Sequence, residues 1–212
     1  PRSTLFPYTT LFRSIKFIEH FYPKSLSHLS TCKSPQQMFG AVAKTYYAEK
    51  MGIDPRRLVV VSIMPCTAKK FECKRPEMKS AYHWWKEKMD LNEKEAFFDV
   101  DYVLTTRELA RMFKMTGVDF KNLPEEEFDN PLGISTGAGA IFAATGGVME
   151  AAVRTAYEVV AGKPLADLNL KVVRGFDGIR EAELDINGTK LRVAVAHTLK
   201  NARVLLDQIE EG

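Results

Sequence analysis

Apolar residues in this 212-residue chain occur in short continuous runs, separated by segments that favour helices. A continuous apolar run of strand length predicts a buried strand. The predicted strands are residues 58–63, 97–104, 170–176, 182–186 and 191–196. Asn187 and Gly188 separate the last two and are typical of a tight hairpin turn, so that pair is expected to be antiparallel.

Helices are predicted between these strands from capping residues and from the glycines that end them. Ser34 stands as an N-cap, Pro35 falls in the first turn and Gln37 at the third position, which together indicate a helix start. That helix is expected to end at Gly52. The predicted helices are residues 15–21, 34–50, 105–117, 140–161 and 198–209, with one more inside a charged excursion at 74–94. This alternation predicts an α/β fold with a mixed, mainly parallel sheet and flanking helices.

Composition and charge are those of a globular domain and narrow the possible functions. Hydrophobic residues make up 45% of the chain and charged residues 27%. A net charge of +3, without a basic stripe interleaved with aromatics, argues against nucleic-acid binding. No apolar run is long enough to cross a bilayer. Cys32, Cys66 and Cys73 show no disulfide pattern, which fits a reducing compartment or a metal role.

The N-terminal segment at residues 1–14 differs from the rest of the chain. It lacks both the layout of a signal peptide and a usable amphipathic period. Its sequence is typical of an in-frame translation of a DNA sequencing adapter, and a natural flexible tail is the alternative. We therefore expect residues 1–14 to be a non-native tail and residues 15–212 to be the folded part, an internal piece of a longer protein.

Cys66 is the clearest candidate for chemistry, because it follows the strand predicted at 58–63. Pro65 has no N–H and ends the ladder, so the thiol is expected at the carboxyl edge of the sheet, where open α/β folds bind ligands. Lys69 follows three residues later and adds a cation if a helical turn begins there. A soft anionic ligand beside a cation suits an iron–sulfur or other anionic metal centre. The residues alone leave open the commoner case of a cysteine that is a small buried hydrophobe.

The segment around Cys66 also resembles a known signature. Residues 64–72, with the sequence Met-Pro-Cys-Thr-Ala-Lys-Lys-Phe-Glu, are similar to the second of three cysteine signatures in the catalytic domain of iron-only ([FeFe]) hydrogenases. Further segments resemble the same family in the same order: residues 30–37, 105–109, 136–142, 145–152 and 173–179. Several motifs in the same order are a more specific signal than any single motif. The resemblance covers nearly all of residues 15–212.

The resemblance implies a reaction, a cofactor and a two-lobed catalytic domain. Members of this family interconvert protons and dihydrogen, using electrons from ferredoxin or a similar carrier. Their cofactor, the H-cluster, joins a [4Fe-4S] cluster held by cysteines to a diiron subcluster with CO, CN and dithiolate ligands. By motif, Cys66 is implied to be one cluster ligand, and the remaining ligands are implied to lie outside this sequence. The chain by itself is therefore expected to be inactive.

The resemblance also implies roles for residues near Cys66. Lys69 would donate a hydrogen bond to a cyanide, Met64 would shield the diiron site and Ser30 would join a proton relay. The residues implied to line the cofactor are Ser34, Pro35, Gln36, Gly137 and Gly139. Each of these positions also admits a plainly structural role, such as a surface lysine, a core methionine, a helix cap or close helix packing. Glu72 is expected to lie on a helix face or to form an ion pair rather than to take part in catalysis.

The hydrogenase hypothesis has two alternatives. One is a non-catalytic paralogue that acts in iron–sulfur protein assembly or hydrogen sensing, and the other is an α/β thiol protein without a cluster. The partners implied by the resemblance are a ferredoxin-type electron carrier and cluster maturation proteins, with no nucleic acid and no membrane span. A cytoplasmic location is expected, and a periplasmic one is the alternative.

Overall fold

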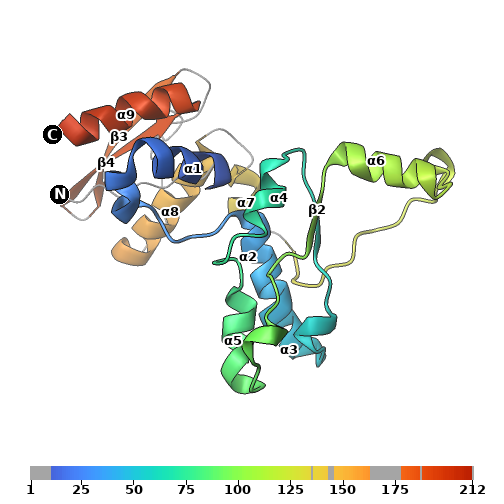
Figure 1. The fold of residues 1–212 in the computed structure, drawn as a ribbon. Coiled ribbons are helices and arrows are strands. Elements are labelled where there is room, and N and C mark those ends of the chain that lie inside the picture. The colour runs from blue at the N-terminus through green and yellow to red at the C-terminus, as the bar shows by residue number, and fades with distance from the viewer. Residues whose placement is uncertain (1–10, 135, 143–145, 163–177, 187, 212) are drawn as a thin grey trace. The chain divides into compact units, whose positions relative to one another are not determined.

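The computed structural model describes residues 11–134, 136–142, 146–162, 178–186 and 188–211 (Figure 1). The chain divides into two compact units, residues 1–16 with 28–133 and residues 17–27 with 134–212. Both units combine helices with a pair of strands, which confirms the α/β class. The strand predicted at 170–176 lies outside the described residues.

Helix α1 (Leu11–Phe21) contributes residues to both units, and it begins earlier than the predicted start at residue 15. A 3-10 turn (Pro23–His28) follows it.

The first unit is built on one long helical segment. Helix α2 (Pro35–Val42), a π-helical turn (Ala43–Tyr47) and α3 (Ala48–Met51) follow one another without a break. Gly52 ends the segment with a φ of 64°, a left-handed conformation that glycine adopts without steric cost. The long helix predicted from Ser34 onwards is therefore confirmed.

The sheet of the first unit consists of two parallel strands, β1 (Val61–Ile63) and β2 (Tyr102–Leu104). Both are shorter than the apolar runs that predict them. The prediction that the first run is a buried strand is wrong for most of its side chains. Ser62 is buried, whereas Val61 and Ile63 are 48% and 40% exposed. Side chains alternate across a strand, so the described part of this sheet is packed on one face and open on the other.

The apolar core of the first unit lies beside this sheet. Cys73, Val100 and Val103 are buried together, and Val60 and Met64 pack against them. Met64 directly follows β1, so the residue at the end of the strand is anchored in the core.

A buried carboxylate, Asp99, joins separate segments of the first unit. Its oxygens accept hydrogen bonds from the backbone N–H groups of Ser80 and Ala81 and from the Lys33 ammonium, the last at 2.6 Å. Gly40 on α2 approaches the same residue closely, because a Cβ added there would lie 2.5 Å from the Asp99 carbonyl oxygen. A buried charge needs such partners, and Asp99 has them.

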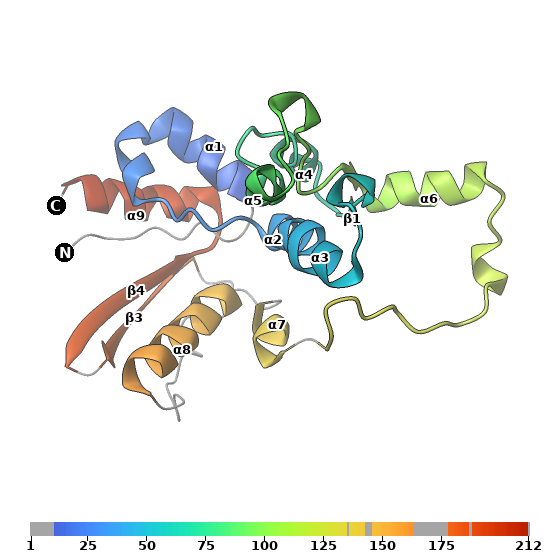
Figure 2. The same cartoon turned by 90° about the horizontal axis from the view of Figure 1, so that it is seen from below.

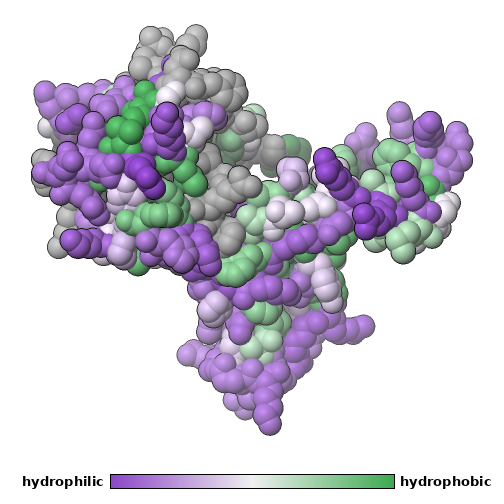
Figure 3. Space-filling model, turned by 45° about the horizontal axis from the view of Figure 1, so that its top comes forward, coloured by the Kyte–Doolittle hydropathy of each residue, from purple (hydrophilic) through white to green (hydrophobic). Residues whose placement is uncertain are grey.

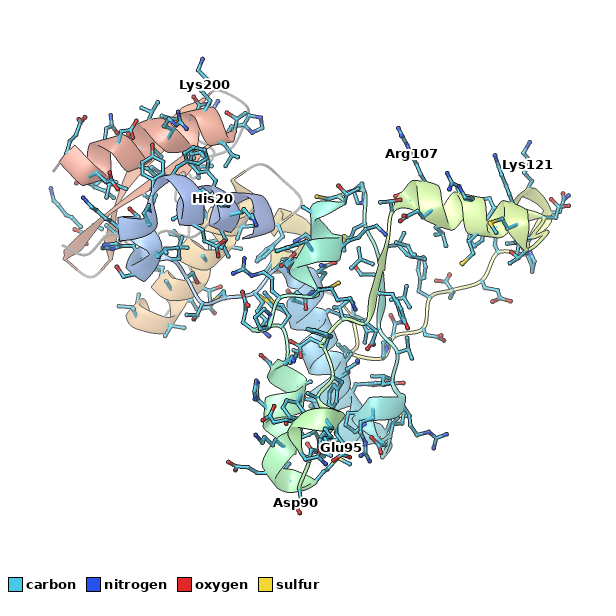
Figure 4. The ribbon with its side chains drawn as sticks, viewed as in Figure 1. His20, Asp90, Glu95, Arg107, Lys121 and Lys200 are labelled. Carbon is cyan, nitrogen blue, oxygen red and sulfur yellow. The ribbon has the colours of Figure 1, made fainter. Side chains whose placement is uncertain are left out.

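The charged excursion predicted at residues 74–94 carries one helix, α5 (Ser80–Lys88), as expected. The indole N–H of Trp85 donates to the carbonyl oxygen of Lys44 at 2.7 Å and so fastens the excursion to the π-helical turn. Asp90 lies at the tip of the excursion with a φ of 50° (Figure 4).

Helix α6 (Thr106–Met115) follows β2 and projects from the remainder of the first unit in both ribbon views (Figures 1 and 2). Thr105 caps it as predicted: the Thr105 hydroxyl accepts from the Glu108 N–H, and the Glu108 carboxylate accepts from the Thr105 N–H. All ten residues of α6 are described, and none of them is buried. Both hydrophilic and hydrophobic residues lie on the surface of this projecting segment (Figure 3), and Arg107 points outward from its first turn (Figure 4).

Short 3-10 turns complete the first unit, at Pro55–Arg57, Glu93–Glu95 and Phe120–Asn122.

The second unit consists of helices around an antiparallel hairpin. Besides the parts of α1 and of the 3-10 turn within residues 17–27, its described elements are α7 (Gly137–Phe142), α8 (Gly147–Ala161), β3 (Ile179–Ile186), β4 (Thr189–Ala196) and α9 (Leu199–Glu211). The hairpin confirms the predicted antiparallel pair, and Gly188 in its turn has a φ of 84°.

The single helix predicted at residues 140–161 is instead two helices, α7 and α8. Gly146 directly precedes α8 with a φ of 80°, which is incompatible with a continuing α-helix. Gly147 packs so closely on α7 that a Cβ would fall 1.7 Å from the Ile141 carbonyl oxygen. Two of the small residues that suggested one uninterrupted helix, Gly146 and Gly147, thus serve the start of the second helix.

The prediction that this helical region is buried on several sides is also wrong. Val153 packs with Val193 of the hairpin, so one face of α8 is covered. Val159 and Val160, near the end of α8, are exposed.

None of the helices in the described part of the chain combines the length and the apolar character needed to span a membrane.

Candidate functional site

Cys66 lies where β1 leaves the sheet. The Met64 N–H donates to the Leu104 carbonyl oxygen at 2.8 Å, which carries the pairing with β2 one residue past β1. Pro65 has no N–H to offer, and the chain then turns into α4 (Ala68–Glu72). The structure therefore places Cys66 at the carboxyl end of a parallel strand, as predicted, and its side chain is half-buried.

A helical turn starts directly at the cysteine. The Lys69 N–H donates to the Cys66 carbonyl oxygen at 3.3 Å, and the Lys70 N–H donates to the Thr67 carbonyl oxygen at 3.1 Å. This is the turn that the spacing of Cys66 and Lys69 required. Thr67, in the N-cap position of α4, makes no capping bond with its side chain.

The ammonium of Lys69 is held by a buried carboxylate. Its Nζ lies 2.6 Å from Oε2 of Glu72, three residues further along α4. The two side chains are 12% and 1% exposed, so this ion pair is almost wholly inside the protein. The predicted ion-pair role of Glu72 is confirmed. The second oxygen, Oε1, is also buried and has no hydrogen-bond partner among the described residues.

Lys70, the next residue, has a very different environment. Its ammonium bonds the Val103 carbonyl oxygen at 2.9 Å and lies 2.8 Å from Glu108 Oε2 at the start of α6, with both side chains about 40% exposed. The hydrogen bond from Lys70 and those from Thr105 lower the pKa of Glu108 to about 2. Lys70 thus links α4 to α6 at the surface.

The start of α2 contacts β1 through a buried hydrogen bond. The Ser62 hydroxyl donates to Oε1 of Gln36 at 2.7 Å. The strand that leads to Cys66 and the helix start that carries Ser34, Pro35 and Gln36 therefore lie side by side.

Three side chains at this helix start are buried with polar atoms that are not satisfied. Ser34 Oγ, Gln36 Nε2 and both amide atoms of Gln37 have no hydrogen-bond partner in the described part of the chain. Ser34 occupies the N-cap position and Pro35 the first turn, as predicted, but the Ser34 side chain makes no capping bond. Buried polar groups are normally paired. These atoms are therefore donors and acceptors that remain available for hydrogen bonds.

Met64 and Ser30 have contacts that structural roles explain. Met64 packs against the core cluster of Cys73, Val100 and Val103. Ser30 Oγ accepts a hydrogen bond from the Cys32 N–H at 3.1 Å, in an exposed turn before α2.

Gly137 and Gly139 begin α7 in the second unit. A Cβ added to Gly137 would meet no atom within 4 Å, so nothing in the described residues demands a glycine there.

The other two cysteines are not placed like Cys66. Cys32 is exposed, and Cys73 is buried with its thiol donating to the Lys70 carbonyl oxygen at 3.2 Å. Burial raises the pKa of Cys73, which disfavours the thiolate that metal binding needs. Across the residues that the structure describes, no three His, Cys, Asp or Glu side chains form a group that could hold a metal ion. Among the described residues, Cys66 is thus the cysteine that lies at the end of a parallel strand, and a cubane cluster needs four ligands.

Sequence reasoning missed Ser62 and Gln37. Ser62 interrupts the apolar run at 58–63, and that single polar residue was the available signal for an inward-facing hydrogen bond. Gln37 was assigned only to a helix start, because periodicity does not show that an amide will be fully buried.

Comparison with known proteins adds the family. Residues 13–212 match the family described as "Iron only hydrogenase large subunit, C-terminal domain". The chain belongs to this family. Proteins similar to it include hydrogenases, which are oxidoreductases.

Two curated hydrogenases illustrate the similarity. The chain is 52% identical over 198 residues to the NADP-reducing hydrogenase subunit HndD of Solidesulfovibrio fructosivorans. It is 48% identical over 197 residues to the periplasmic [Fe] hydrogenase large subunit of Nitratidesulfovibrio vulgaris. Each match covers 93% of this chain but only 32% and 44% of the relatives, so the chain spans less than half of their length.

The fold agrees with a solved hydrogenase. The [FeFe]-hydrogenase HydA1 from Chlamydomonas reinhardtii is similar with a TM-score of 0.72 and 37% identity, over all of this chain and 57% of that one. The chain is also similar to a protein with another name: cytosolic iron-sulfur assembly component 3 of Pongo abelii is 29% identical over 194 residues, which are 88% of this chain and 37% of that protein.

Proposed function

We propose that residues 15–212 form the central part of an [FeFe]-hydrogenase catalytic domain that reduces protons to dihydrogen reversibly with ferredoxin-type electrons. The observation that carries this proposal is the position of Cys66, at the carboxyl end of β1 and at the start of a helical turn that contains Lys69. The higher identity to hydrogenases, 52% and 48%, than to the assembly component, 29%, supports the catalytic function over the assembly function.

The cofactor would be the family's H-cluster, a [4Fe-4S] cluster joined to a diiron subcluster with CO, CN and dithiolate ligands, which supplies the redox chemistry when bound. The residues present fit part of it. Cys66 offers one thiolate, and the unsatisfied donors at Ser34, Gln36 and Gln37 suit a ligand rich in hydrogen-bond acceptors. The remaining cysteine ligands would come from other parts of the complete protein.

Each proposed site residue then has a physical task. The Cys66 thiolate would bind iron, and the Lys69 ammonium would donate a charge-assisted hydrogen bond to an anionic ligand, an interaction of about 1.5–3 kcal/mol. Met64, a thioether that donates no protons, would exclude water from the metal. Ser30, both donor and acceptor, would pass a proton.

The residues proposed to line the cofactor are Ser34, Pro35, Gln36, Gly137 and Gly139. Their small size or their amide and hydroxyl groups would allow close approach and hydrogen bonding to it.

The proposed partners are a ferredoxin or similar electron carrier and the maturation proteins that insert the cluster. We propose a cytoplasmic location, although the similar hydrogenases include one named as periplasmic. Neither a nucleic acid nor a membrane is part of the proposed activity.

The decisive experiment replaces Cys66 by serine in the complete hydrogenase that contains this chain. We expect the variant to lose cluster iron and hydrogen evolution together, because serine cannot replace a thiolate ligand of the cluster. Cys32→Ser and Cys73→Ser are the matched controls, and both are expected to keep their iron. Full iron content in Cys66→Ser would refute the proposal.

The same preparation tests the alternative function, in which the protein is a non-catalytic paralogue for iron–sulfur assembly or hydrogen sensing. That alternative predicts bound iron that depends on Cys66 but no hydrogen evolution. The chain alone, supplied with iron and sulfide under anaerobic conditions, is expected to give no stoichiometric cubane signal by electron paramagnetic resonance, since it provides one ligand.

A further inference from the structure

Two neighbouring lysines of α4 each pair with a carboxylate, but in opposite environments. Lys69 lies 2.6 Å from Glu72, and the two side chains are 12% and 1% exposed. Lys70 lies 2.8 Å from Glu108, and both of those side chains are about 40% exposed. Exposed ion pairs contribute little, whereas a buried charge depends on its partner. The Lys69–Glu72 pair is therefore a fixed feature of the interior.

We infer that Glu72 is a positioning residue for Lys69: it fixes the direction of the Lys69 ammonium and so the N–H groups that remain for an anionic ligand. This inference rests on the proposed role of Lys69 in holding the diiron subcluster. Glu72 itself is not proposed to touch the cofactor or to transfer a proton.

The geometry explains why a flexible lysine would need such a partner. A lysine side chain has a long, freely rotating stem, and its ammonium donates up to three hydrogen bonds. One of these goes to Glu72 Oε2 from within the same helix, three residues away, which restricts the orientation of the remaining two. Because α4 starts at the Cys66 turn, an ammonium fixed to α4 is also fixed relative to the thiol.

Burial keeps water from replacing the Glu72 carboxylate as the partner of the Lys69 ammonium. Its side chain is almost fully enclosed, and Oε1 has no hydrogen-bond partner among the described residues. Burying a carboxylate with one unpaired oxygen costs folding free energy unless an ion pair offsets that cost. The ion pair of Glu72 is with Lys69.

The test compares two variants of the complete, cofactor-loaded hydrogenase by infrared spectroscopy of its cyanide stretching bands. In Glu72→Gln we expect one cyanide band to shift while iron content stays unchanged, and hydrogen evolution to fall roughly tenfold, as the loss of one charge-assisted hydrogen bond implies. The control Glu108→Gln removes the partner of Lys70 and is expected to leave every band in place. Unshifted bands in Glu72→Gln, or equal shifts in both variants, would overturn the inference.

Two further variants separate positioning from a loss of folding. Glu72→Asp keeps the charge on a shorter side chain, so we expect a smaller shift of the same band and partial recovery of activity. In a Lys69→Met background, Glu72→Gln is expected to add no shift, because the ammonium that Glu72 positions is gone. A full additional shift in that background would show that Glu72 acts independently of Lys69 and would refute its positioning role.

The outcomes also distinguish this inference from the proposed function. If Cys66→Ser keeps its iron and no cyanide bands are present in the parent protein, the proposed function fails. If the bands are present and depend on Cys66 but do not respond to Glu72, only the positioning role fails.

Discussion

The two helices that follow the parallel strands, α4 after β1 and α6 after β2, differ in what holds them in place. Helix α6 has ten residues and a complete capping box, yet buries none of them. Helix α4 has five residues and no side-chain cap, yet buries Ala68 and Glu72. Helix α6 is specified by local hydrogen bonds whose partners can be recognised in the sequence. Helix α4 depends on tertiary contacts, and it carries the proposed chemistry.

The largest effect expected from this difference is on the stability of α4 and the core beside it. Replacing Glu72 by alanine would leave the Lys69 ammonium buried without its partner, which typically costs about 3 kcal/mol or more. We expect a clear fall in the free energy of unfolding, measured by urea titration of the chain.

The control for that prediction is Glu93→Ala. Glu93 also pairs with a lysine at 2.6 Å, Lys86, but its side chain is 75% exposed. We expect no measurable change in the unfolding midpoint. Equal destabilisation by the two substitutions would contradict the claim that burial sets the importance of the Glu72 pair.

A smaller and more local effect is expected for the cap of α6. Thr105→Ala removes the hydroxyl that accepts the Glu108 N–H and should cost about 1 kcal/mol of helix stability. Since no residue of α6 is buried, we expect faster amide hydrogen exchange in the first turn of α6 while the global unfolding midpoint stays unchanged. A fall in the global midpoint would show that α6 is coupled to the core.

The smallest effect is a pH dependence of the same cap. Hydrogen bonds from Lys70 and Thr105 lower the pKa of Glu108 from 4.5 to about 2. A lowered pKa means that the carboxylate stabilises the folded helix fully above about pH 4.5 and loses this contribution as the pH falls through about 2. The amides at the start of α6 should therefore lose their protection from hydrogen exchange only at the acid end of that range. Glu108→Gln should remove this pH dependence.

The same contrast explains how much could be predicted from the sequence. The cap at Thr105, the helix end at Gly52 and the hairpin of β3 and β4 follow from interactions between residues a few positions apart, and all three were predicted. The lengths of β1 and β2 and the division of the helix at 140–161 were not, because they depend on which segments pack together.

The candidate site was predictable to a similar degree. The position of Cys66 at the end of a strand and the turn that contains Lys69 follow from local sequence, and the structure agrees. The hydrogen bond from Ser62 to Gln36 joins residues that are far apart in the chain, so the polar residue in the apolar run indicates an inward-facing hydrogen bond but not its partner. The burial of Gln37 and the depth of the Lys69–Glu72 pair are likewise products of tertiary packing.

The proposed binding of iron by the Cys66 thiolate is tested most directly by the anomalous scattering of iron in crystals of the complete protein that contains this chain. The account predicts an iron peak in bonding contact with the Cys66 sulfur and none at Cys32 or Cys73. An absence of iron at Cys66, or iron at either of the other cysteines in its place, would contradict it.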